Sequence, residues 1–453
     1  MEAVTFILEL LVVLGAIIMG TRSSGVGLGL WGGTGVAILV FVFREPVGSP
    51  PVDALLIVLS VVLASSMMQA AGGIDWMVGV AAKLISRSPK QITLVAPLVS
   101  FLFSAGAGTS NILYPLLPVI QDLSYKNNIR PSRPLSLSVV ATGVALACSP
   151  VSAAMAAMVT LTDAPAYGYE LIDIVKVTFP AAVVGIVLAS FVVSRLGKDI
   201  ADDPEIQARI AAGKFEAPKQ DGPLSHADVA PTAKGRNAAL IFLGGVLVIV
   251  IFGLFKDLRP LVPGLIDGAP GQVPLAMTPI IEIVMFVVGT LILLVARPKV
   301  AEIPTMTVFK AGMVSAIALF GLAWLTDTFL GAHQQVIADT VGGWVGNWPW
   351  IFALGIFLVC VLTTSQSTAT RTVVPIGLAA GIPLGLLSGM WAGAFAGIYL
   401  LPTNGSQIAA ANFDYTGSTK LGTKLVDHSF FVPTLVLAGF TIIAGAGFGL
   451  LWG

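Results

Sequence analysis

Long apolar runs alternate with short polar segments along the whole chain. A helix needs about 17 to 25 apolar residues to cross roughly 30 Å of hydrocarbon. The first runs of that length cover residues 4–20, 26–43 and 53–72. We predict a membrane-crossing helix for each of them. The next segment, 75–90, is amphipathic and carries Lys83, Arg87 and Lys90, which favours a helix lying on the membrane surface.

The next two apolar stretches are interrupted by polar and helix-breaking residues. The stretch 91–120 is broken near its middle, which indicates a hairpin of two short helices with its tip at Gly106, Gly108, Thr109, Ser110 and Asn111. The run 134–160 contains Ser149, Pro150 and Ser152. Proline lacks a backbone donor and breaks helices, so we predict one broken span. An uninterrupted span follows at 171–193, and the polar segment 194–237 is a linker.

The second half repeats this order. Apolar spans are expected at 238–255, 277–296 and 311–330, and a short amphipathic stretch follows at 333–347. The run 349–382 surrounds a polar tip made of Thr363, Thr364, Ser365, Gln366, Ser367 and Thr368. The run 385–412 is broken at Pro402, Thr403, Asn404, Gly405 and Ser406, and a last span covers 430–451. The predicted fold is therefore an all-α polytopic membrane protein with two repeats, 1–193 and 238–453.

The distribution of basic residues predicts opposite orientations for the two repeats. Short cytoplasmic loops collect Lys and Arg. The linker, the loop after residue 296 and the loop before residue 134 are rich in them, whereas 161–170 and 331–348 contain none. Only Arg44, Lys256 and Arg259 disagree with this count. The count predicts a cytoplasmic linker and both termini outside. Inverted repeats with paired broken helices are typical of secondary transporters, whose binding sites lie near the bilayer midplane.

Composition excludes most other classes of protein. The chain is 56% hydrophobic and only 11% charged, against about 25% charged in soluble proteins. With 24 basic and 24 acidic residues, no global field favours nucleic acid. The cysteines Cys148 and Cys360 lie in apolar segments, and His226, His333 and His428 lie far apart. We therefore expect no disulfide, metal site or cofactor.

The four breaks predict one shared substrate site. Unsatisfied backbone groups cost several kcal/mol each in hydrocarbon, so breaks occur where they are buried or line a cavity. Hydroxyls, amides and helix N-termini suit a small anion. The alternative is that small residues merely let helices pack closely. The candidate residues are Gly108, Thr109, Ser110, Asn111, Ser149, Ser152, Ser365, Gln366, Ser367, Thr368, Arg371, Thr403, Asn404 and Ser406.

Arg371 is the candidate with the clearest chemistry. It follows the second tip by six residues, and a cation inside a membrane is costly unless it has a function. Its planar guanidinium fits a carboxylate. The alternative is an arginine that reaches the interface or pairs with a structural carboxylate. Glu9, Glu282 and Asp327 also lie within spans, where proton or sodium binding and structural pairing both stay open.

Several motifs resemble those of the anaerobic C4-dicarboxylate transporter (Dcu) family. They are SAGAGTSNILYPLLP from Ser104 to Pro118, Arg130-Pro131 with Arg133-Pro134-Leu135-Ser136, Ser149 to Ala154, Ser365-Gln366 before Thr368 to Arg371, Leu401-Pro402-Thr403, Asp414-Tyr415-Thr416-Gly417, and His428 to Pro433. The resemblance covers nearly the whole chain. Two positions depart from the family pattern, because Ser110 stands where glycine is expected and Arg371 stands where lysine is expected.

The resemblance implies exchange of fumarate, succinate, malate or aspartate across the bacterial inner membrane by an elevator mechanism. The moving parts would be 91–193 and 349–453, and the scaffold would be 1–72 and 238–330. Asn111, Asn404 and the helix ends would supply donors to a second carboxylate. A sodium- or proton-coupled symporter of the same fold, a channel and, more remotely, a membrane-embedded enzyme remain alternatives. Apart from substrate and lipid, a homodimer partner is left open.

Overall fold

The computed structural model describes most of the chain. The described residues are 2–23, 26–50, 52–163, 167–215, 232–266, 269–402, 404–422 and 426–452. The chain divides into two compact units, each of which is described by itself. Unit 1 comprises Met1–Ile74, Pro150–Lys176 and Thr232–Val336, and unit 2 comprises Asp75–Ser149, Val177–Pro231 and Ile337–Gly453.

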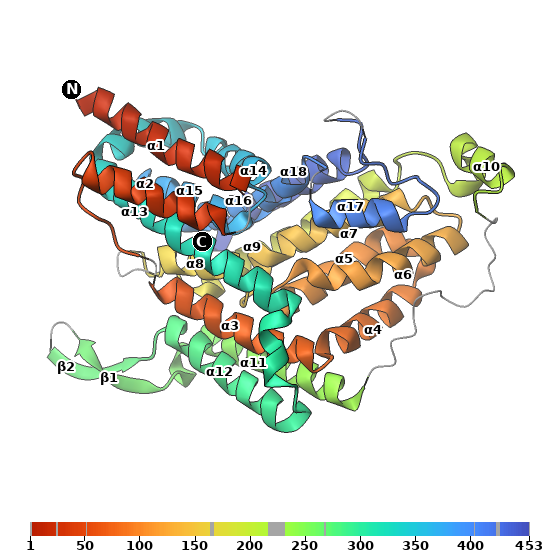
Figure 1. Ribbon diagram of the computed structural model, residues 1–453, viewed down its shortest axis with the longest axis horizontal. Coiled ribbons are helices and arrows are strands. Elements are labelled where there is room, and N and C mark those ends of the chain that lie inside the picture. The colour runs from red at the N-terminus through yellow and green to blue at the C-terminus, as the bar shows by residue number, and fades with distance from the viewer. Residues whose placement is uncertain are drawn as a thin grey trace. The chain divides into compact units, whose positions relative to one another are not determined.

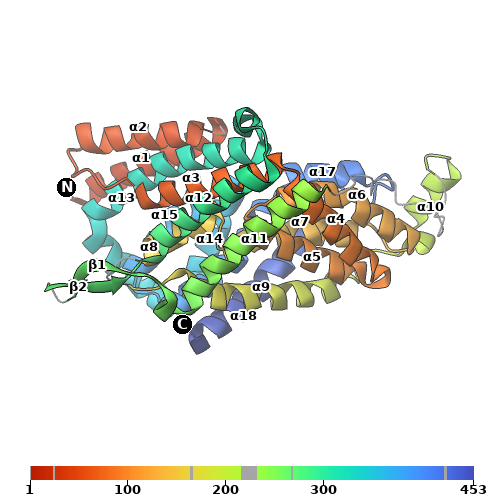
Figure 2. The same cartoon turned by 90° about the horizontal axis from the view of Figure 1, so that it is seen from below.

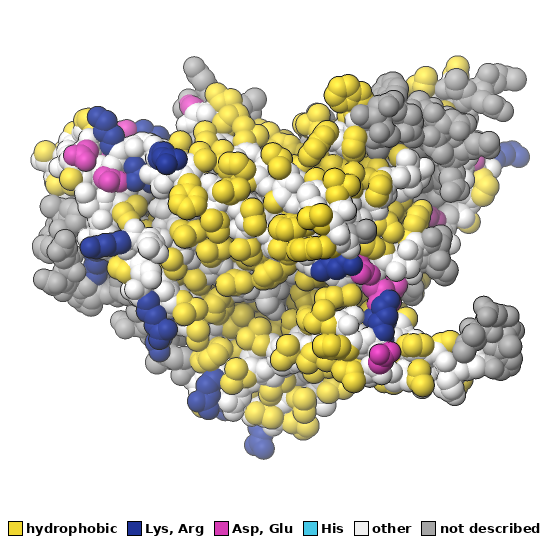
Figure 3. Space-filling model, turned by 180° about the vertical axis from the view of Figure 1, so that it is seen from behind, with side chains coloured by type: hydrophobic (Ala, Val, Ile, Leu, Met, Phe, Trp, Pro, Cys, Tyr) yellow, Lys and Arg dark blue, Asp and Glu magenta, His cyan; other side chains and the backbone are white. Residues whose placement is uncertain are grey.

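Helices make up nearly all of the described chain, as the apolar runs predict (Figure 1). Among the described residues, seven helices are long and apolar enough to cross a membrane, namely Pro89–Ala107, Ser132–Thr162, Leu171–Val193, Ala233–Leu254, Met277–Ala296, Thr307–His333 and Phe431–Trp452. A further pair, Leu55–Ala70 and Gly73–Ser86, bends by 74° at its junction. Hydrophobic side chains cover much of the surface drawn in Figure 3, as contact with lipid requires. The prediction of an all-α polytopic membrane protein is confirmed.

Unit 1 is built from antiparallel apolar helices. Its helices are α1 (Glu2–Ser23), α2 (Gly27–Phe41), α3 (Val52–Ala70), α8 (Ala153–Thr162), α11 (Ala233–Leu254), α12 (Met277–Ala296) and most of α13 (Thr307–Asn347). Helix α3 packs against α11 and α12, and α1 packs against α2. Helices α2 and α13 lie side by side in both ribbon views (Figures 1 and 2). They meet at Gly29 and Gly321, where an added methyl group on Gly321 would lie 1.9 Å from the Gly29 carbonyl oxygen.

A β-hairpin between α11 and α12 is absent from the sequence-based prediction. Strands β1 (Leu261–Ile266) and β2 (Ala269–Pro274) pair antiparallel, with Leu261 opposite Pro274 and Gly264 opposite Gly271. Prolines and glycines in both strands look like a loop when each strand is read alone. Only the pairing between the strands makes this segment a hairpin, so hydropathy does not detect it.

Unit 2 contains both interrupted hairpins. Its helices are α4 (Gly73–Ser86) from residue 75 onward, α5 (Ile92–Ala107), α6 (Leu113–Lys126), α7 (Ser132–Ala145), α9 (Leu171–Val193) from residue 177 onward, α10 (Pro204–Ala211), α14 (Trp350–Thr363), α15 (Gln366–Ala379), α16 (Leu384–Ala394), α17 (Gly405–Phe413) and α18 (Phe431–Trp452). Helix α5 packs against α7, and α16 packs against α18. Close approach between the latter pair depends on glycine, because an added methyl group on Gly389 would lie 2.0 Å from the Gly445 carbonyl oxygen.

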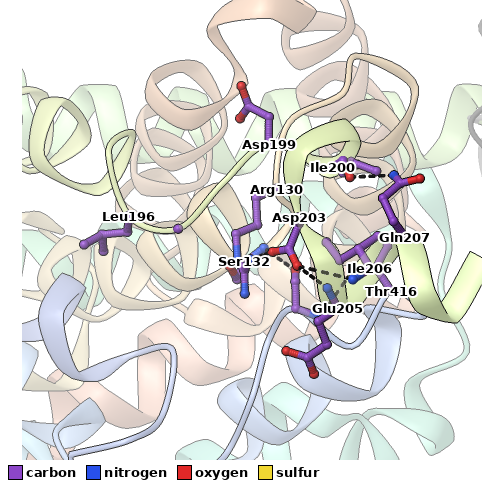
Figure 4. A network of polar contacts seen from close by, with 12 residues as sticks. Arg130, Ser132, Leu196, Asp199, Ile200, Asp203, Glu205, Ile206, Gln207 and Thr416 are labelled. Atoms are coloured by element: carbon purple, nitrogen blue, oxygen red, sulfur yellow. Dashed lines mark hydrogen bonds and ion pairs between the residues drawn. The ribbon is translucent and has the colours of Figure 1, made fainter.

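The first part of the polar linker is folded against unit 2 (Figure 4). Asp203 caps the N-terminus of α10 by accepting hydrogen bonds from the Glu205 and Ile206 amides, at 3.0 and 3.2 Å. The other carboxylate oxygen of Asp203 forms an ion pair with Arg130. Arg133 pairs in turn with Asp199. These ion pairs attach the linker to the start of α7. Residues 216–231 of the linker lie outside the described chain.

Candidate functional site

The first predicted tip is a sharp helix-to-helix turn in unit 2. Helix α5 ends at Ala107, and Gly108 adopts the left-handed conformation with φ = 68°. Thr109 is extended, and its hydroxyl accepts a hydrogen bond from the Asn111 amide at 3.2 Å. A short 3₁₀ turn, η2 (Ser110–Ile112), then leads into α6. The Thr109 hydroxyl therefore caps the second helix of the hairpin.

The second predicted tip has the same local construction. Helix α14 ends at Thr363, and Thr364 is left-handed with φ = 51°. Ser365 is extended and caps α15, because its hydroxyl accepts a hydrogen bond from the Thr368 amide at 3.2 Å. The Thr368 hydroxyl donates to the Ser365 hydroxyl at 2.8 Å. Both tips thus place a left-handed residue and then a hydroxyl cap before the returning helix.

Both predicted broken spans are broken in the structure. Helix α7 passes through the 3₁₀ turn η3 (Leu146–Cys148) to an extended Ser149, and Ser152 then caps α8 by accepting from the Met155 amide at 3.0 Å. Helix α16 passes through η7 (Phe395–Tyr399), and Asn404 caps α17 in a capping box with Gln407. Thr403 lies outside the described residues. The division between the two units falls inside the first break, so Ser152 belongs to unit 1 and Ser149 to unit 2.

Three of the four breaks come together within unit 2. The Gln366 side-chain amide at the second tip donates to the Gly143 carbonyl oxygen of α7 at 2.8 Å and to the Phe395 carbonyl oxygen at 3.4 Å. A methyl group on Gly405 would lie 3.1 Å from the Tyr114 hydroxyl, next to the first tip. The η2 turn at the first tip also packs against α7. Gln366 is therefore occupied in bridging helices, which limits its capacity to bind a substrate.

Arg371 lies in α15 and is only 4% exposed. Its Nε, Nη1 and Nη2 atoms are buried and have no hydrogen-bond partner in the part of the chain that the structure describes. The guanidinium of Arg371 does not reach the surface, and it does not pair with a described carboxylate. Both alternatives raised for this residue from the sequence are therefore unsupported among the described residues. An ionised group buried without a partner is strongly unfavourable. A bound anion would relieve that cost.

Two of the acidic candidates have identifiable surroundings. Asp327 accepts a hydrogen bond from the Ser49 amide at 2.7 Å, so it supports the segment after α2. Glu282 lies in α12 and is half-buried. Neither residue belongs to unit 2, which contains the tips and Arg371. Both residues belong to unit 1 instead, together with Ser152.

Two of the cations that disagree with the charge count are neutralised by one carboxylate in unit 1. Arg259 donates from Nη1 to Glu170 Oε1 at 3.2 Å, and its Nη2 also bonds to that carboxylate. Lys256 Nζ lies 3.2 Å from Glu170 Oε1. Burial opposes ionisation of Glu170, but hydrogen bonds and attraction from Arg259 and Lys256 outweigh it and lower the pKa of Glu170 below its ordinary value. These three charged side chains form a structural salt-bridge cluster.

A cavity of about 290 Å³ opens elsewhere in unit 2. Its lining combines segments from both halves of the sequence, and the polar members are Arg130, Ser132, Arg133, Ser136, Ser418, Lys420, Asp427, His428 and Ser429. None of the predicted binding residues that the structure describes lines it. Most of the polar residues that line this cavity belong to the sequence motifs that resemble those of the Dcu family. The repeated occurrence of Arg and Ser around residues 130–136 was the available signal for a polar pocket.

The whole chain can be compared with known proteins. Residues 5–452 match the family described as anaerobic C4-dicarboxylate membrane transporter. The chain belongs to this family. It is 34% identical to the anaerobic C4-dicarboxylate transporter DcuB of Escherichia coli over 99% of both chains. It is 32% identical to the C4-dicarboxylate transporter DcuA of Wolinella succinogenes over 97% of this chain and 98% of that protein. This is a family of membrane transporters and not of enzymes.

Two solved structures share the fold of this family member. The YdaH transporter of Alcanivorax borkumensis aligns with a TM-score of 0.58 and 15% identity over 99% of both chains. The MtrF protein of Neisseria gonorrhoeae, which belongs to a class of antimetabolite efflux pumps, aligns with a TM-score of 0.53 and 13% identity over 92% of this chain and 84% of that protein. At these identities the likeness concerns the fold alone.

Proposed function

We propose that this protein exchanges C4-dicarboxylates, such as fumarate, succinate, malate and aspartate, across the bacterial inner membrane. The family and its curated relatives supply the substrate class. The buried guanidinium of Arg371 supplies the chemistry, because a planar fork donates two parallel hydrogen bonds to a carboxylate. The absence of a hydrogen-bond partner for Arg371 within the described chain is the observation that carries the proposal.

The substrate site is proposed to lie between Arg371 and the two hairpin tips. One carboxylate of the dianion pairs with Arg371, and the other accepts hydrogen bonds from Asn111, Asn404 and the ends of the capped helices. Convergence of the tips on α7 and η7 within unit 2 supports this arrangement. The capping bonds of Thr109 and Ser365 support it as well, since they order the backbone that faces the substrate.

The proposed topology of two inverted repeats, 1–193 and 238–453, draws support from contacts between loops. Each polar cluster joins segments that the charge count assigns to one side of the membrane. Glu170 meets Arg259 on the outer side, whereas Arg130 meets Asp203 and Lys420 meets Glu205 on the cytoplasmic side. The matching conformations of the two tips also support a repeat. We propose that the linker is cytoplasmic and both termini are outside.

An elevator mechanism is proposed for the conformational step. Unit 1 contains both segments of the proposed scaffold, 1–72 and 238–330, and unit 2 contains most of the proposed moving parts, including 349–453. The segment Pro150–Lys176 groups with unit 1, although the sequence assigns it to the moving part. Separate compact units are compatible with alternating access by rigid-body displacement. Unit 2, which contains Arg371 and both hairpin tips, would then carry the anion.

Counterflow in proteoliposomes tests this function. Vesicles with the full-length protein are loaded with unlabelled fumarate or with buffer alone, and uptake of labelled succinate is measured. We expect uptake to require internal fumarate. Arg371→Ala should reduce it at least about 1,000-fold, because truncating one member of a buried charge pair costs several kcal/mol. Arg371→Lys should retain part of it, since lysine keeps the charge but loses the bidentate geometry.

The matched control is Arg87→Ala, which removes an exposed arginine of the same unit. It should transport at the wild-type rate. No uptake by folded wild-type protein under either loading would reject the substrate class. Uptake that needs a sodium or proton gradient and no internal fumarate would replace the exchanger with a coupled symporter.

A further inference from the structure

Three ionisable side chains from distant parts of unit 1 meet in one cluster. Glu9 belongs to α1, Glu45 follows α2, and His333 lies at a break inside α13. One ligand atom from each residue, a carboxylate oxygen or an imidazole nitrogen, lies within 4.8 Å of the other two. The Nε2 atom of His333 is hydrogen-bonded to Glu9 Oε2. The transport site proposed above uses none of these residues.

The backbone around the cluster holds two of these side chains in position. Arg44 adopts a left-handed conformation with φ = 65°, which turns the chain back over the end of α2. The Glu45 amide then donates to the Leu39 carbonyl oxygen at 3.1 Å. His333 departs from helical geometry, with φ = −122° and ψ = 19°. Left-handed residues other than glycine and breaks within helices are unfavourable unless their surroundings hold them.

Aromatic packing orients the imidazole. The ring of His333 lies 5.0 Å from the rings of both Phe6 and Phe329, measured between centroids. Phe6 is one turn of α1 away from Glu9, so the same helix supplies both the packing and the carboxylate. The ring nitrogen that contacts Glu9 is consequently held within 4.8 Å of a carboxylate oxygen of each glutamate.

One buried oxygen of this cluster lacks a hydrogen-bond partner among the described side chains. Glu9 is fully buried, and its Oε1 atom has no hydrogen-bond partner among the described residues. A divalent cation placed among these side chains would give the buried Glu9 Oε1 atom the partner that it lacks among the described residues.

We propose that Glu9, Glu45 and His333 bind one divalent transition-metal ion, with Zn²⁺ as the reference member of the class. Three protein ligands leave one position for water, as in open zinc sites. Metal–ligand bonds of about 2.1 Å place tetrahedral ligands about 3.4 Å apart. His333 Nε2 and Glu9 Oε2 lie closer together than this, at 2.5 Å, and all three ligand atoms lie within 4.8 Å of one another, so binding requires small adjustments of the side chains.

The donor set selects the class of ion. Mg²⁺ and Ca²⁺ take oxygen ligands almost exclusively, whereas imidazole nitrogen suits Zn²⁺, Fe²⁺, Ni²⁺ and Cu²⁺. Glu45 and His333 are half-buried, so the cluster reaches the surface of unit 1. A bound ion would join α1, the segment after α2 and the break in α13. The expected role is to stabilise unit 1, independently of which anion the protein transports.

Metal binding is tested on purified full-length protein treated with chelator and freed of any histidine tag. Co²⁺ is titrated first, because its visible ligand-field absorption reports coordination directly, and Zn²⁺ is then used to displace it. We expect Co²⁺ absorption in the wild type and an increase in the thermal unfolding midpoint with Zn²⁺. Glu9→Gln, Glu45→Gln and His333→Gln should each weaken Zn²⁺ binding at least about tenfold.

Glu302→Gln is the matched control, because Glu302 is an exposed carboxylate of the same unit. It should bind Co²⁺ and Zn²⁺ like the wild type. If Glu9→Gln does not fold, the two half-buried positions decide the test. The proposal fails if monodisperse wild type gives no Co²⁺ absorption. It fails equally if His333→Gln binds Zn²⁺ with wild-type affinity, and a proton shared by the two carboxylates would then account for the cluster.

Discussion

Two buried arginines in this protein have opposite surroundings. Arg259 in unit 1 is 6% exposed and Arg371 in unit 2 is 4% exposed. Arg259 binds both oxygens of Glu170 and donates from Nε to the Phe252 carbonyl oxygen at 2.8 Å. The guanidinium of Arg371 contacts no described hydrogen-bond acceptor. The two arginines are thus similarly buried, but every guanidinium nitrogen of Arg259 donates a hydrogen bond to a described acceptor, whereas none of Arg371 does.

This difference separates a structural arginine from a binding arginine. Breaking a buried pair destabilises a protein because the remaining charge has no partner. Removing a buried charge that has no partner in the empty protein has no such cost. The same residue type should thus affect mainly folding at position 259 and mainly ligand binding at position 371. The predictions below test that separation, in order of decreasing effect.

Arg259→Met should cause the largest loss of stability, about 3 kcal/mol, because it leaves Glu170 with Lys256 alone. Methionine keeps most of the length of the side chain, so lost packing contributes little. Thermal unfolding of the detergent-solubilised protein, followed by tryptophan fluorescence, measures the change. Arg87→Met serves as the exposed control. Unfolding of Arg259→Met at the wild-type temperature would remove the distinction between the two arginines.

Succinate should stabilise the wild type through Arg371. At a concentration of 100 Kd, a ligand that binds only the folded state contributes about 2.7 kcal/mol. We expect a dose-dependent rise of the unfolding midpoint in the wild type and in Arg259→Met, but none in Arg371→Met. An equal rise in all three proteins would place the anion site elsewhere, for example in the cavity beside Arg130 and Arg133.

Glu170→Gln should destabilise the protein by about 2 kcal/mol at neutral pH, as expected for hydrogen bonds to charged groups. The pKa of Glu170 is lower in the folded protein than its ordinary value of 4.5. Its stabilising effect is therefore present above that value and is lost as pH falls through the folded value. Unfolding midpoints of wild type and variant should converge on acidification. A difference that stays constant with pH would exclude ionised Glu170 as the cause.

Arg371→Met should have the smallest effect on stability in the absence of dicarboxylate. Replacing a buried, unpaired cation with an apolar side chain of similar length should leave the unfolding midpoint unchanged or raise the stability by about 1 kcal/mol. The same variant should not transport succinate. A large loss of stability in dicarboxylate-free buffer would mean that Arg371 has a structural partner.

Sequence patterns predict the helices of this protein well because the bilayer imposes their length. Three of the four interruptions were also predictable from Gly108, Pro150 and Pro402, which end or break helices, and the fourth, at Thr364, was predictable only from the polar run around it. The hairpin β1–β2 was not, because its strands are recognised only by their pairing. The helix α10 was also missed, because hydropathy does not detect a short polar helix. Its sequence is too polar to form an apolar run, and it is stabilised by the Asp203 cap, the Arg130 ion pair and the packing of Ile206 against Tyr125 and Ile200.

The candidate site was predictable in part. Arg371 stands out because a cation follows a polar tip inside an apolar run, but only the fold reveals that no described partner satisfies it. The capping bonds of Thr109 and Ser365 also require known backbone geometry. Glu9 and His333 are 324 positions apart in sequence. Nothing in a single sequence predicts that they meet, and hydropathy treats each as an isolated polar residue.

The contact between Gly29 and Gly321 has a consequence for motion within unit 1. Two backbones touch there without an intervening side chain, so no change of rotamer can loosen or tighten the contact. Small residues allow helices in membranes to approach in this way. Any relative movement of α2 and α13 must displace whole helices, and such collective motion is slow compared with side-chain rearrangement. Helices α2 and α13 should therefore move together as one rigid body.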